Sequence, residues 1–350
     1  RLRGLWADSM DCGGGSVRRI GESTLEFQLP PSILSHGAVT GKKEAEGPLG
    51  KEFDQTFEDT TLGEDSWEKA EARLQREAVS IALKKVQLSE NQVDFILAGD
   101  LLNQCISSTF GLMNFGIPFL GQYGACSTMA QTLLMASILV ESGAARRALA
   151  VTSSHFCSAE RQFRLPLEYG SQRSPTAQWT ATGSGCTLVG TGGPVKVIRG
   201  LAGRIQDLGV KDAANMGAAM APAAADSIYR FLTDTHTTPQ DYDGIFTGDL
   251  GAVGSQLLLE CLDREGVNLR PVHQDCGLLL YDRERQDVHA GGSGCGCSAS
   301  VLCGHLLPML ERGELHNILF CATGALMSPT SSQQGQSIPG VCHVVQLVGA

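Results

Sequence analysis

The segment from Gly121 to Thr128, GQYGACST, places Cys126 where a turn leads into a run of small residues. If a helix begins here, its free N–H groups and its dipole favour a thiolate, which is the nucleophilic form of cysteine. Cys126 is therefore a candidate catalytic nucleophile. A cysteine in this position can also serve as a small buried residue where a helix start packs closely. The segment alone leaves both interpretations open.

A second group of reactive side chains could bind a metal, because Cys295, Cys297, Cys303 and His305 lie within eleven consecutive positions. Their spacing differs from the CxxC spacing of structural zinc sites. On one helix, Cys303 and His305 would also point to different faces. We therefore expect no metal site. The sequence shows no Walker or dinucleotide-binding glycine loop between a strand and a helix, so we also expect no cofactor.

Two aspartates, Asp100 and Asp249, each follow a glycine at the end of an apolar run. Paired carboxylates can perform acid–base chemistry. Aspartate after a strand-end glycine is, however, common as a turn residue or as a helix cap. We predict that both aspartates hold local backbone in this way.

The elements that would position these residues occur twice in the chain. The run FILAGDL at 95–101 has a counterpart in GIFTGDL at 244–250, and GACS at 124–127 has one in GCGCS at 294–298. Each cysteine-bearing turn precedes a small-residue helix and then an apolar strand. From Cys126 to Thr152, and from Cys297 to Thr323, the distance is 26 positions in both cases. Strands that alternate with helices indicate parallel βαβ units.

The repeat predicts an α/β protein of two similar halves, residues 22–190 and 195–350, joined through Gly190–Pro194. We interpret residues 1–21 as a disordered or misassigned start. The remaining predicted elements are a short strand followed by a surface loop in 22–65, a helix over 67–85 capped by Ser66, a strand over 93–98, helices over 128–143 and 299–313, and strands over 147–152 and 317–323.

Composition excludes several classes of protein. The chain has 350 residues, a net charge of −10 and 12 cysteines. An acidic protein lacks the basic surface that nucleic acids and anionic lipids require, so we expect no nucleic-acid partner. The longest apolar run, Met129–Val140, is too short and too polar to span a bilayer. Because no signal-peptide pattern opens the chain, we expect reduced thiols in a cytosol rather than disulfides.

The duplicated layout with a Gly-Ala-Cys-Ser helix start resembles the thiolase-like superfamily of thiolases and ketoacyl synthases. An ordered set of motifs over about residues 25–345 more closely resembles the stage V sporulation protein AD family of spore-forming bacteria. These motifs are GPLG at 47–50, LAGDLLNQ at 97–104, GIPFLG at 116–121, TSSH at 152–155, AERQFR at 159–164, MAPAAAD at 220–226 and AGGSGCGCS at 290–298.

The resemblance implies a thiolase-like α/β/α/β/α sandwich and an edge-to-edge homodimer. It also implies a non-catalytic, soluble subunit that binds dipicolinic acid (pyridine-2,6-dicarboxylic acid). That subunit would belong to a membrane assembly that moves this acid into the developing spore. Other stage V sporulation membrane proteins would hold it at the cytoplasmic face of the forespore or spore inner membrane.

Condensing enzymes of the superfamily need a proton relay and an oxyanion hole beside the thiol. In ketoacyl synthases a histidine follows the strand that matches Ile245–Thr247, whereas Gly248–Leu250 contain none. The second helper position holds Cys295. We therefore predict no efficient carbon–carbon condensation and regard Cys126 as a vestigial nucleophile. A fallback is that His155 or His289, each in a turn near a strand end, assists Cys126.

Dipicolinate carries two carboxylates on a flat ring, so its site needs cations or helix N-termini. From the resemblance we predict that a pocket at Cys126 binds it. The expected ligand-binding residues are Cys126, His155, Arg161, Arg164, Cys295 and Cys297, with Phe163 against the ring. Alternatively, Arg161 and Arg164 form surface ion pairs with Glu160.

Two other functions remain open at this point. One is an acyltransferase of thiolase or ketoacyl synthase type that acts through Cys126 on an acyl thioester. The other is a structural scaffold with an empty pocket.

Overall fold

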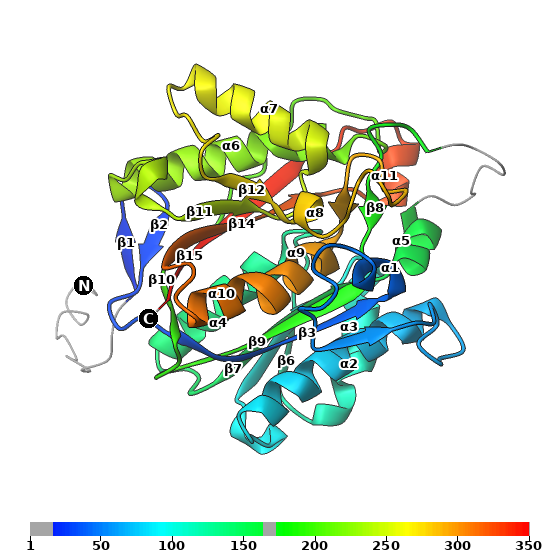
Figure 1. Cartoon of the computed structure of the whole chain (residues 1–350). Helices are drawn as coiled ribbons and strands as arrows, with labels where there is room; N and C mark the ends of the chain where they lie inside the picture. Colours follow the sequence, from blue (N-terminus) through cyan, green and yellow to red (C-terminus); the bar gives the residue numbers. More distant parts are fainter. Residues whose placement is uncertain (1–16, 164–172, 350) are drawn as a thin grey trace, which may run out of the picture.

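The structure is a computed structural model that describes residues 17–163 and 173–349 (Figure 1). Most of the predicted disordered start, residues 1–16, lies outside the described residues. For residues 17–21 the prediction was wrong, because strand β1 (Arg18–Ile20) pairs antiparallel with β2 (Thr24–Glu26). The carboxylate of Asp234 holds this hairpin by accepting hydrogen bonds from the backbone N–H groups of residues 22, 23 and 24 at 2.8–3.0 Å.

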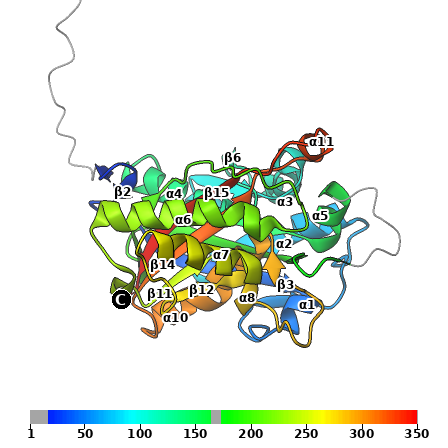
Figure 2. The same cartoon turned by 90° about the horizontal axis from the view of Figure 1, so that it is seen from above.

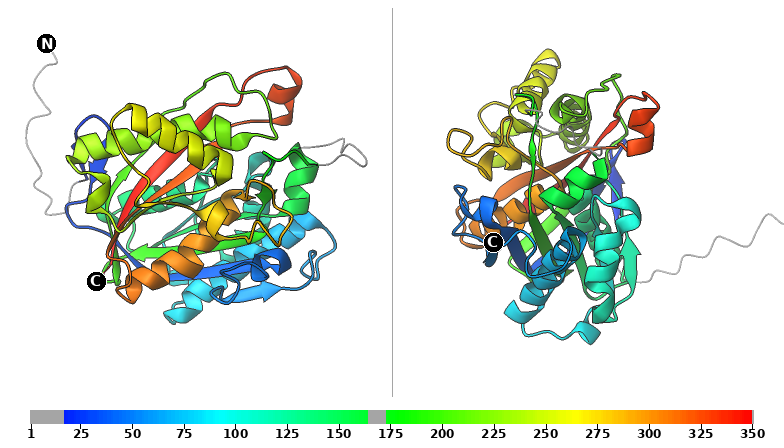
Figure 3. Two further views of the ribbon diagram at one scale, coloured as in Figure 1. Left: turned by 45° about the horizontal axis from the view of Figure 1, so that its top comes forward. Right: turned by 90° about the vertical axis from the view of Figure 1, so that its right-hand side faces the viewer.

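Five layers make up the core, as the sequence predicted (Figures 1 and 3). The central layer holds α4 (Thr128–Glu141), α9 (Cys295–Val301), a π-helical turn (Leu302–Leu306) and α10 (Leu307–Glu311). A half-sheet lies on each side of this layer. Outside the first half-sheet lie α2 (Trp67–Lys85) and α3 (Ile106–Leu112), and outside the second lie α6 (Met216–Thr235) and α7 (Gly251–Arg264) (Figure 2).

Each half-sheet contains three parallel strands that are linked by helices. In the first, β5 (Phe95–Gly99) pairs parallel with β6 (Phe119–Gly121) and with β7 (Ala148–Ser154), and α4 leads into β7. In the second, β11 (Gly244–Thr247) pairs parallel with β12 (His273–Asp275) and with β14 (Asn317–Ala325), and α9 and α10 lead into β14. An antiparallel strand then borders each group, β9 (Gly183–Gly190) beside β7 and β15 (Gly340–Val348) beside β14. The predicted duplication is therefore present in the pairing pattern as well as in the sequence.

The two half-sheets are joined by hydrogen bonds into one continuous sheet. Strand β10 (Val195–Leu201) pairs with β15 and also, at Val195 and Lys196, with β3 (Ser32–Gly41). The complete order is β12-β11-β14-β15-β10-β3-β9-β7-β5-β6. Strands β6 and β12 lie at the two ends, β4 (Gln55–Phe57) lies against β3, and β8 (Trp179–Thr180) and β13 (Gly292–Ser293) form a separate pair.

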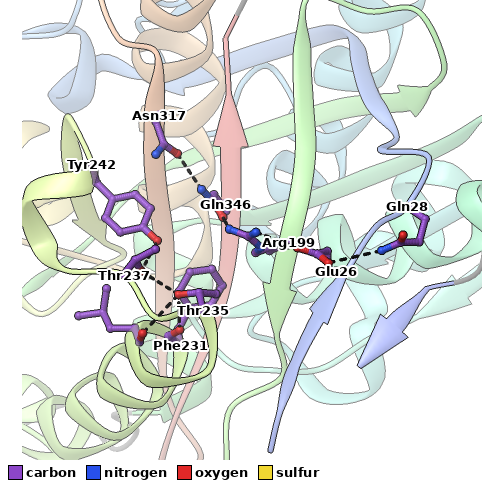
Figure 4. A network of polar contacts seen from close by, with 10 residues as sticks. Glu26, Gln28, Arg199, Phe231, Thr235, Thr237, Tyr242, Asn317 and Gln346 are labelled. Atoms are coloured by element: carbon purple, nitrogen blue, oxygen red, sulfur yellow. Dashed lines mark hydrogen bonds and ion pairs between the residues drawn. The ribbon is translucent and has the colours of Figure 1, made fainter. Parts of the chain in front are cut away.

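A line of polar side chains crosses the strands near this junction (Figure 4). Arg199 of β10 donates to Glu26 of β2 at 2.7 and 3.0 Å and reaches Gln346 of β15 at 3.5 Å. The Gln346 amide then donates to Asn317 of β14 at 2.9 Å. The N-terminal hairpin is thus attached to the sheet of the C-terminal half.

The helix predicted over residues 67–85 is confirmed as α2, with Ser66 accepting a hydrogen bond from the N–H of Lys69. Strand β3 is a ten-residue buried strand in the stretch that we predicted to be a short strand and a loop. Its buried Ser35, His36 and Thr40 hide the apolar pattern of an interior strand. The shorter elements are α1 (Lys42–Ala45), α5 (Phe156–Phe163), α8 (Cys276–Leu279), α11 (Pro329–Gln333), and 3₁₀ turns at Glu90–Gln92, Asn103–Cys105, Met113–Phe115 and Pro239–Asp241.

Over the described residues, none of the helices combines the length and apolar character that crossing a bilayer requires.

Candidate functional site

Cys126 lies in the turn directly before α4, as the sequence predicted. Ala125 has φ +49°, a left-handed conformation that is uncommon for a residue with a Cβ atom. The turn is held by hydroxyl groups, since Ser127 donates to the carbonyl of Gly124 at 2.6 Å and Thr128 to that of Ala125 at 2.7 Å. The backbone is therefore held in an unfavourable conformation that aims the Cys126 side chain. Strain of this kind is concentrated at functional sites.

The Cys126 side chain lines a pocket. Both halves of the chain contribute to its wall. The apolar part comes mainly from Leu101, Ala159, Phe163, Met216, Ala325 and Met327. The polar part comes from Tyr123, Glu160, Gln178, Thr180 and Ser293. Cys126 is only 5% exposed, so most of its surface is already covered by protein.

Among the charged groups around this thiol, Asp249 has the largest effect on its pKa, and the sequence analysis missed this role. Its carboxylate accepts a hydrogen bond from the Cys126 thiol. It also accepts from the Gly294 N–H at 2.9 Å, the Thr323 hydroxyl at 2.9 Å and the Ser293 hydroxyl at 3.1 Å. Asp249 lies just after β11, in the stretch Gly248–Leu250 that contains no histidine. The sequence did contain a signal for this role, because Asp249 belongs to the repeated segment GIFTGDL at 244–250.

The electrostatics around Cys126 oppose its activation. Burial raises the pKa of the thiol well above its ordinary value, and the charge of Asp249 raises it further. A nucleophilic cysteine needs the reverse, a neighbouring cation or base that lowers its pKa. Burial also raises the pKa of Asp249, although its hydrogen-bond donors act in the opposite direction. Cys126 is therefore a protonated thiol at neutral pH.

The two remaining cysteines of the predicted site have different surroundings. Cys295 is the first residue of α9 and packs in one cluster with Leu101, Cys126 and Ala159. Its thiol donates to the carbonyl of Ser153 at 2.9 Å, and burial raises its pKa well above the ordinary value. Cys297 belongs to the core between the sheets and lies outside the pocket wall. Cys295 is thus beside the pocket, whereas Cys297 is behind it.

His155 does not join Cys126. Its Nε2 donates to the carbonyl of Thr60 at 2.7 Å, and its Nδ1 accepts from the N–H of Cys157 at 3.1 Å. Both ring nitrogens are therefore engaged, and burial lowers the pKa of the ring. His155 lines a different pocket, together with Lys43 and Trp179. The other fallback residue, His289, lies 2.9 Å from the carboxylate of Asp287.

Arg161 points away from the pocket. Its guanidinium forms a bidentate ion pair with Glu68, with Nε 2.9 Å from Oε1, and lies over the ring of Trp67. The partner is thus on α2, and differs from the Glu160 that the sequence indicated as the alternative. Phe163, on the same helix α5, does line the pocket. Arg164 lies outside the described residues.

The residues weighed as metal ligands have separate partners. The thiol of Cys303 points to the carbonyl of Cys186 at 3.5 Å, and Nδ1 of His305 lies 2.6 Å from Glu52. These two side chains therefore do not converge with Cys295 and Cys297.

The prediction that Asp100 and Asp249 both hold local backbone is confirmed for Asp100. Asp100 accepts from the N–H of Leu102 at 2.9 Å and from the N–H and hydroxyl of Ser108 at 2.8 and 2.6 Å, which fastens the start of α3. For Asp249 the prediction was wrong, because it faces Cys126. The start of α7 is instead capped by Asp275, which accepts from the N–H groups of Leu250 and Gly251. Burial raises the pKa of Asp275 to about 7.

Comparison with known proteins agrees with this geometry. A sequence model of the family described as stage V sporulation protein AD matches residues 21–348. The protein of that name from Bacillus subtilis (strain 168) is 46% identical over 330 residues, which cover 94% of this chain and 97% of that protein.

Solved structures of the thiolase type share the fold. The 3-oxoacyl-[acyl-carrier-protein] synthase III of Aquifex aeolicus VF5 aligns with a TM-score of 0.56 at 13% identity, over 91% of this chain and 99% of that chain. Human mitochondrial 3-ketoacyl-CoA thiolase aligns with a TM-score of 0.57 at 12% identity, over 92% and 99% of the two chains. At these identities the likeness concerns the fold alone. Together with the sequence matches, it shows that this chain is a sporulation protein with a thiolase-like fold and belongs to the stage V sporulation protein AD family.

Proposed function

We propose that this protein binds dipicolinic acid in the pocket beside Cys126. In this proposal it is the non-catalytic, ligand-binding subunit of a membrane assembly that moves the acid into the developing spore. One observation carries the proposal. The superfamily's nucleophile position and its pocket are retained, but the neighbouring carboxylate of Asp249 keeps the thiol protonated. A site of this kind can receive a ligand without attacking it.

The pocket wall suits a flat aromatic acid. Leu101, Phe163 and Met327 supply apolar surface for a ring, and Thr180 supplies a hydroxyl donor for a carboxylate oxygen. His155, Arg161 and Cys297 lie outside this wall, so we no longer assign them to the ligand. Arg164 remains a predicted cation for one carboxylate, since it directly follows Phe163 in the chain.

A substitution that fills the pocket is expected to abolish binding. Ala214 lines the pocket on the loop before α6, and an indole in its place would occupy the space of the ligand ring. We expect Ala214→Trp to weaken dipicolinate binding at least 100-fold in isothermal titration calorimetry. Lys211→Trp provides the matched control, because Lys211 is exposed on the same loop. Equal dipicolinate affinities for the two variants would show that the ligand does not bind in this pocket.

The membrane partners are part of the same proposal. Other stage V sporulation membrane proteins hold the chain at the cytoplasmic face of the forespore or spore inner membrane. The net charge of −10 favours attachment through proteins over attachment to anionic lipids. Loss of membrane association in cells that lack those partners is the expected result, and unchanged association would count against it.

We also propose that two copies pair edge to edge through β6. This strand ends the long sheet, and its Phe119 and Leu120 are about two-fifths exposed, at 40% and 42%. Next to it Phe110 and Met113 are exposed as well. Residues 101–140 contain no charged side chain, so two acidic copies can meet here without repulsion. An antiparallel β6–β6 contact across a two-fold axis would satisfy the open backbone groups of the edge.

The dimer is tested by placing like charges in that contact. We expect the native chain to have the mass of a dimer in light scattering and the double variant Phe110→Lys, Leu120→Lys that of a monomer. Tyr229→Lys, on α6 of the opposite outer layer, is the control and should remain dimeric. A native monomer at micromolar concentration, or a dimeric double variant, would refute this contact.

A further inference from the structure

The amide of Gln178 has a fixed orientation beside the Cys126 pocket. Its Nε2 donates to the carbonyl of Asp249 and to the carbonyl of Gly292, both at 2.7 Å. Because carbonyl oxygens only accept, the nitrogen of the amide must be the atom that faces them. The other atom, Oε1, therefore points elsewhere. The two hydrogen bonds therefore fix which end of the Gln178 amide is the nitrogen and which is the oxygen, an assignment that is otherwise ambiguous for glutamine.

The Oε1 atom of Gln178 is buried, and no donor among the described residues bonds to it. The residue is 5% exposed and forms part of the pocket wall. A buried acceptor without a donor is unfavourable, and such atoms in native proteins call for an explanation. A ligand that brings an O–H or N–H group into the pocket would satisfy Oε1. A group that only accepts would be repelled by it.

We propose that Gln178 is a specificity-determining residue that selects the singly protonated form of the dicarboxylic acid. In this arrangement the protonated carboxyl donates its O–H to Oε1 of Gln178, and the other carboxylate remains charged. The inference rests on the proposed function of the pocket. Its physical basis is that a carboxylate has no donor, whereas a carboxylic acid has one. Binding from neutral solution therefore takes up a proton.

Most of the titratable groups that line the pocket disfavour a second negative charge on the ligand. Arg173, a cation beside Gln178, donates to the backbone carbonyl of that residue. Cys126, Tyr123 and Glu160 line the pocket, while Asp249 and Cys295 lie directly behind Cys126. Burial raises the pKa of the three uncharged groups, Cys126, Tyr123 and Cys295, so none of them balances an anion. The carboxylate of Asp249 would repel a dianion. Protonation of the ligand removes part of that repulsion.

Calorimetry of the native chain tests the inference without any substitution. Dipicolinic acid is titrated between pH 5.5 and 8.0, in pairs of buffers with different ionisation enthalpies. We expect uptake of about one proton for each ligand and a Kd that rises about tenfold for each pH unit, because the singly protonated fraction falls tenfold. Binding without proton uptake would overturn the role of Gln178 but leave the proposed function intact. Absence of binding at every pH would refute the proposed function.

Variants locate the proton. Gln178→Lys keeps a donor for the two carbonyls and replaces the acceptor with a cation, so proton uptake should disappear and the Kd should become independent of pH. Thermal unfolding of this variant reports whether it folds. A Gln178→Lys chain that is folded and still takes up a proton would overturn the proposal. Loss of the uptake in Asp249→Asn or Glu160→Gln would place the proton on the protein and would overturn it too.

Discussion

Asp249→Asn is expected to raise the rate at which iodoacetamide alkylates Cys126 more than tenfold at pH 8. In the native protein the Asp249 carboxylate accepts the hydrogen bond of the thiol and repels its thiolate. An asparagine keeps an acceptor for the Gly294 N–H, but it removes the charge. Each unit by which the thiol pKa falls increases the reactive thiolate about tenfold, as long as the pKa stays above the pH. Peptide mapping by mass spectrometry follows Cys126 separately from the other cysteines.

Asp100→Asn is the matched control, because Asp100 is equally buried but fastens the start of α3 rather than the thiol. Its alkylation rate at Cys126 should match that of the native chain. If Asp249→Asn and Asp100→Asn behave alike, the carboxylate does not hold the thiol in its protonated form.

We expect the same chemistry to prevent acyl transfer through Cys126. Native protein incubated with radiolabelled acyl-coenzyme A should show no stable label on Cys126, since burial and the Asp249 charge hold the thiol protonated and His155 bonds elsewhere. A label that Cys126→Ser abolishes would contradict this expectation and restore the acyltransferase interpretation. Saturable dipicolinate binding without a label would support the binding function. If the protein shows neither dipicolinate binding nor acyl labelling, the interpretation as a structural scaffold remains.

Gly185→Ala is expected to destabilise the fold by about 3 kcal/mol or more. Gly185 lies in β9 against α9, and a Cβ atom there would lie 2.3 Å from the carbonyl oxygen of Ala299. Because that obstacle is backbone, relief requires a shift of α9. The shift would also displace Gly294, whose N–H bonds to Asp249, so the pocket should be disturbed together with the fold. Urea unfolding followed by circular dichroism measures the change.

Gly190→Ala, in the same strand, is the control for that prediction. Its Cβ atom would meet Cδ1 of Leu34 at 2.6 Å, and this side-chain end can rotate away. We expect a loss of about 1 kcal/mol or less. If the free energy of unfolding falls no more in Gly185→Ala than in Gly190→Ala, α9 can shift away from the sheet at little cost.

Several expectations failed for one common reason. Arg161 was assigned to the ligand as a cation that lies close to Phe163 in the chain, yet its guanidinium pairs with Glu68 on α2. His155 was placed beside Cys126 because it follows a strand, yet both of its nitrogens bond to nearby backbone. Gln178 carried no signal at all, because the pairing of β8 with β13 brings it to the pocket. Proximity along the chain did not predict which way these side chains face.

The amino-acid sequence was sufficient for the duplicated βαβ units, the turn that carries Cys126 and the family. These features depend on local periodicity and on ordered motifs, which are written along the chain. The chemical state of Cys126 was not accessible in the same way. It follows from burial and from a carboxylate more than a hundred residues away, and the energy of both depends on distance in space. The folded arrangement of the two halves therefore decides that this thiol stays protonated.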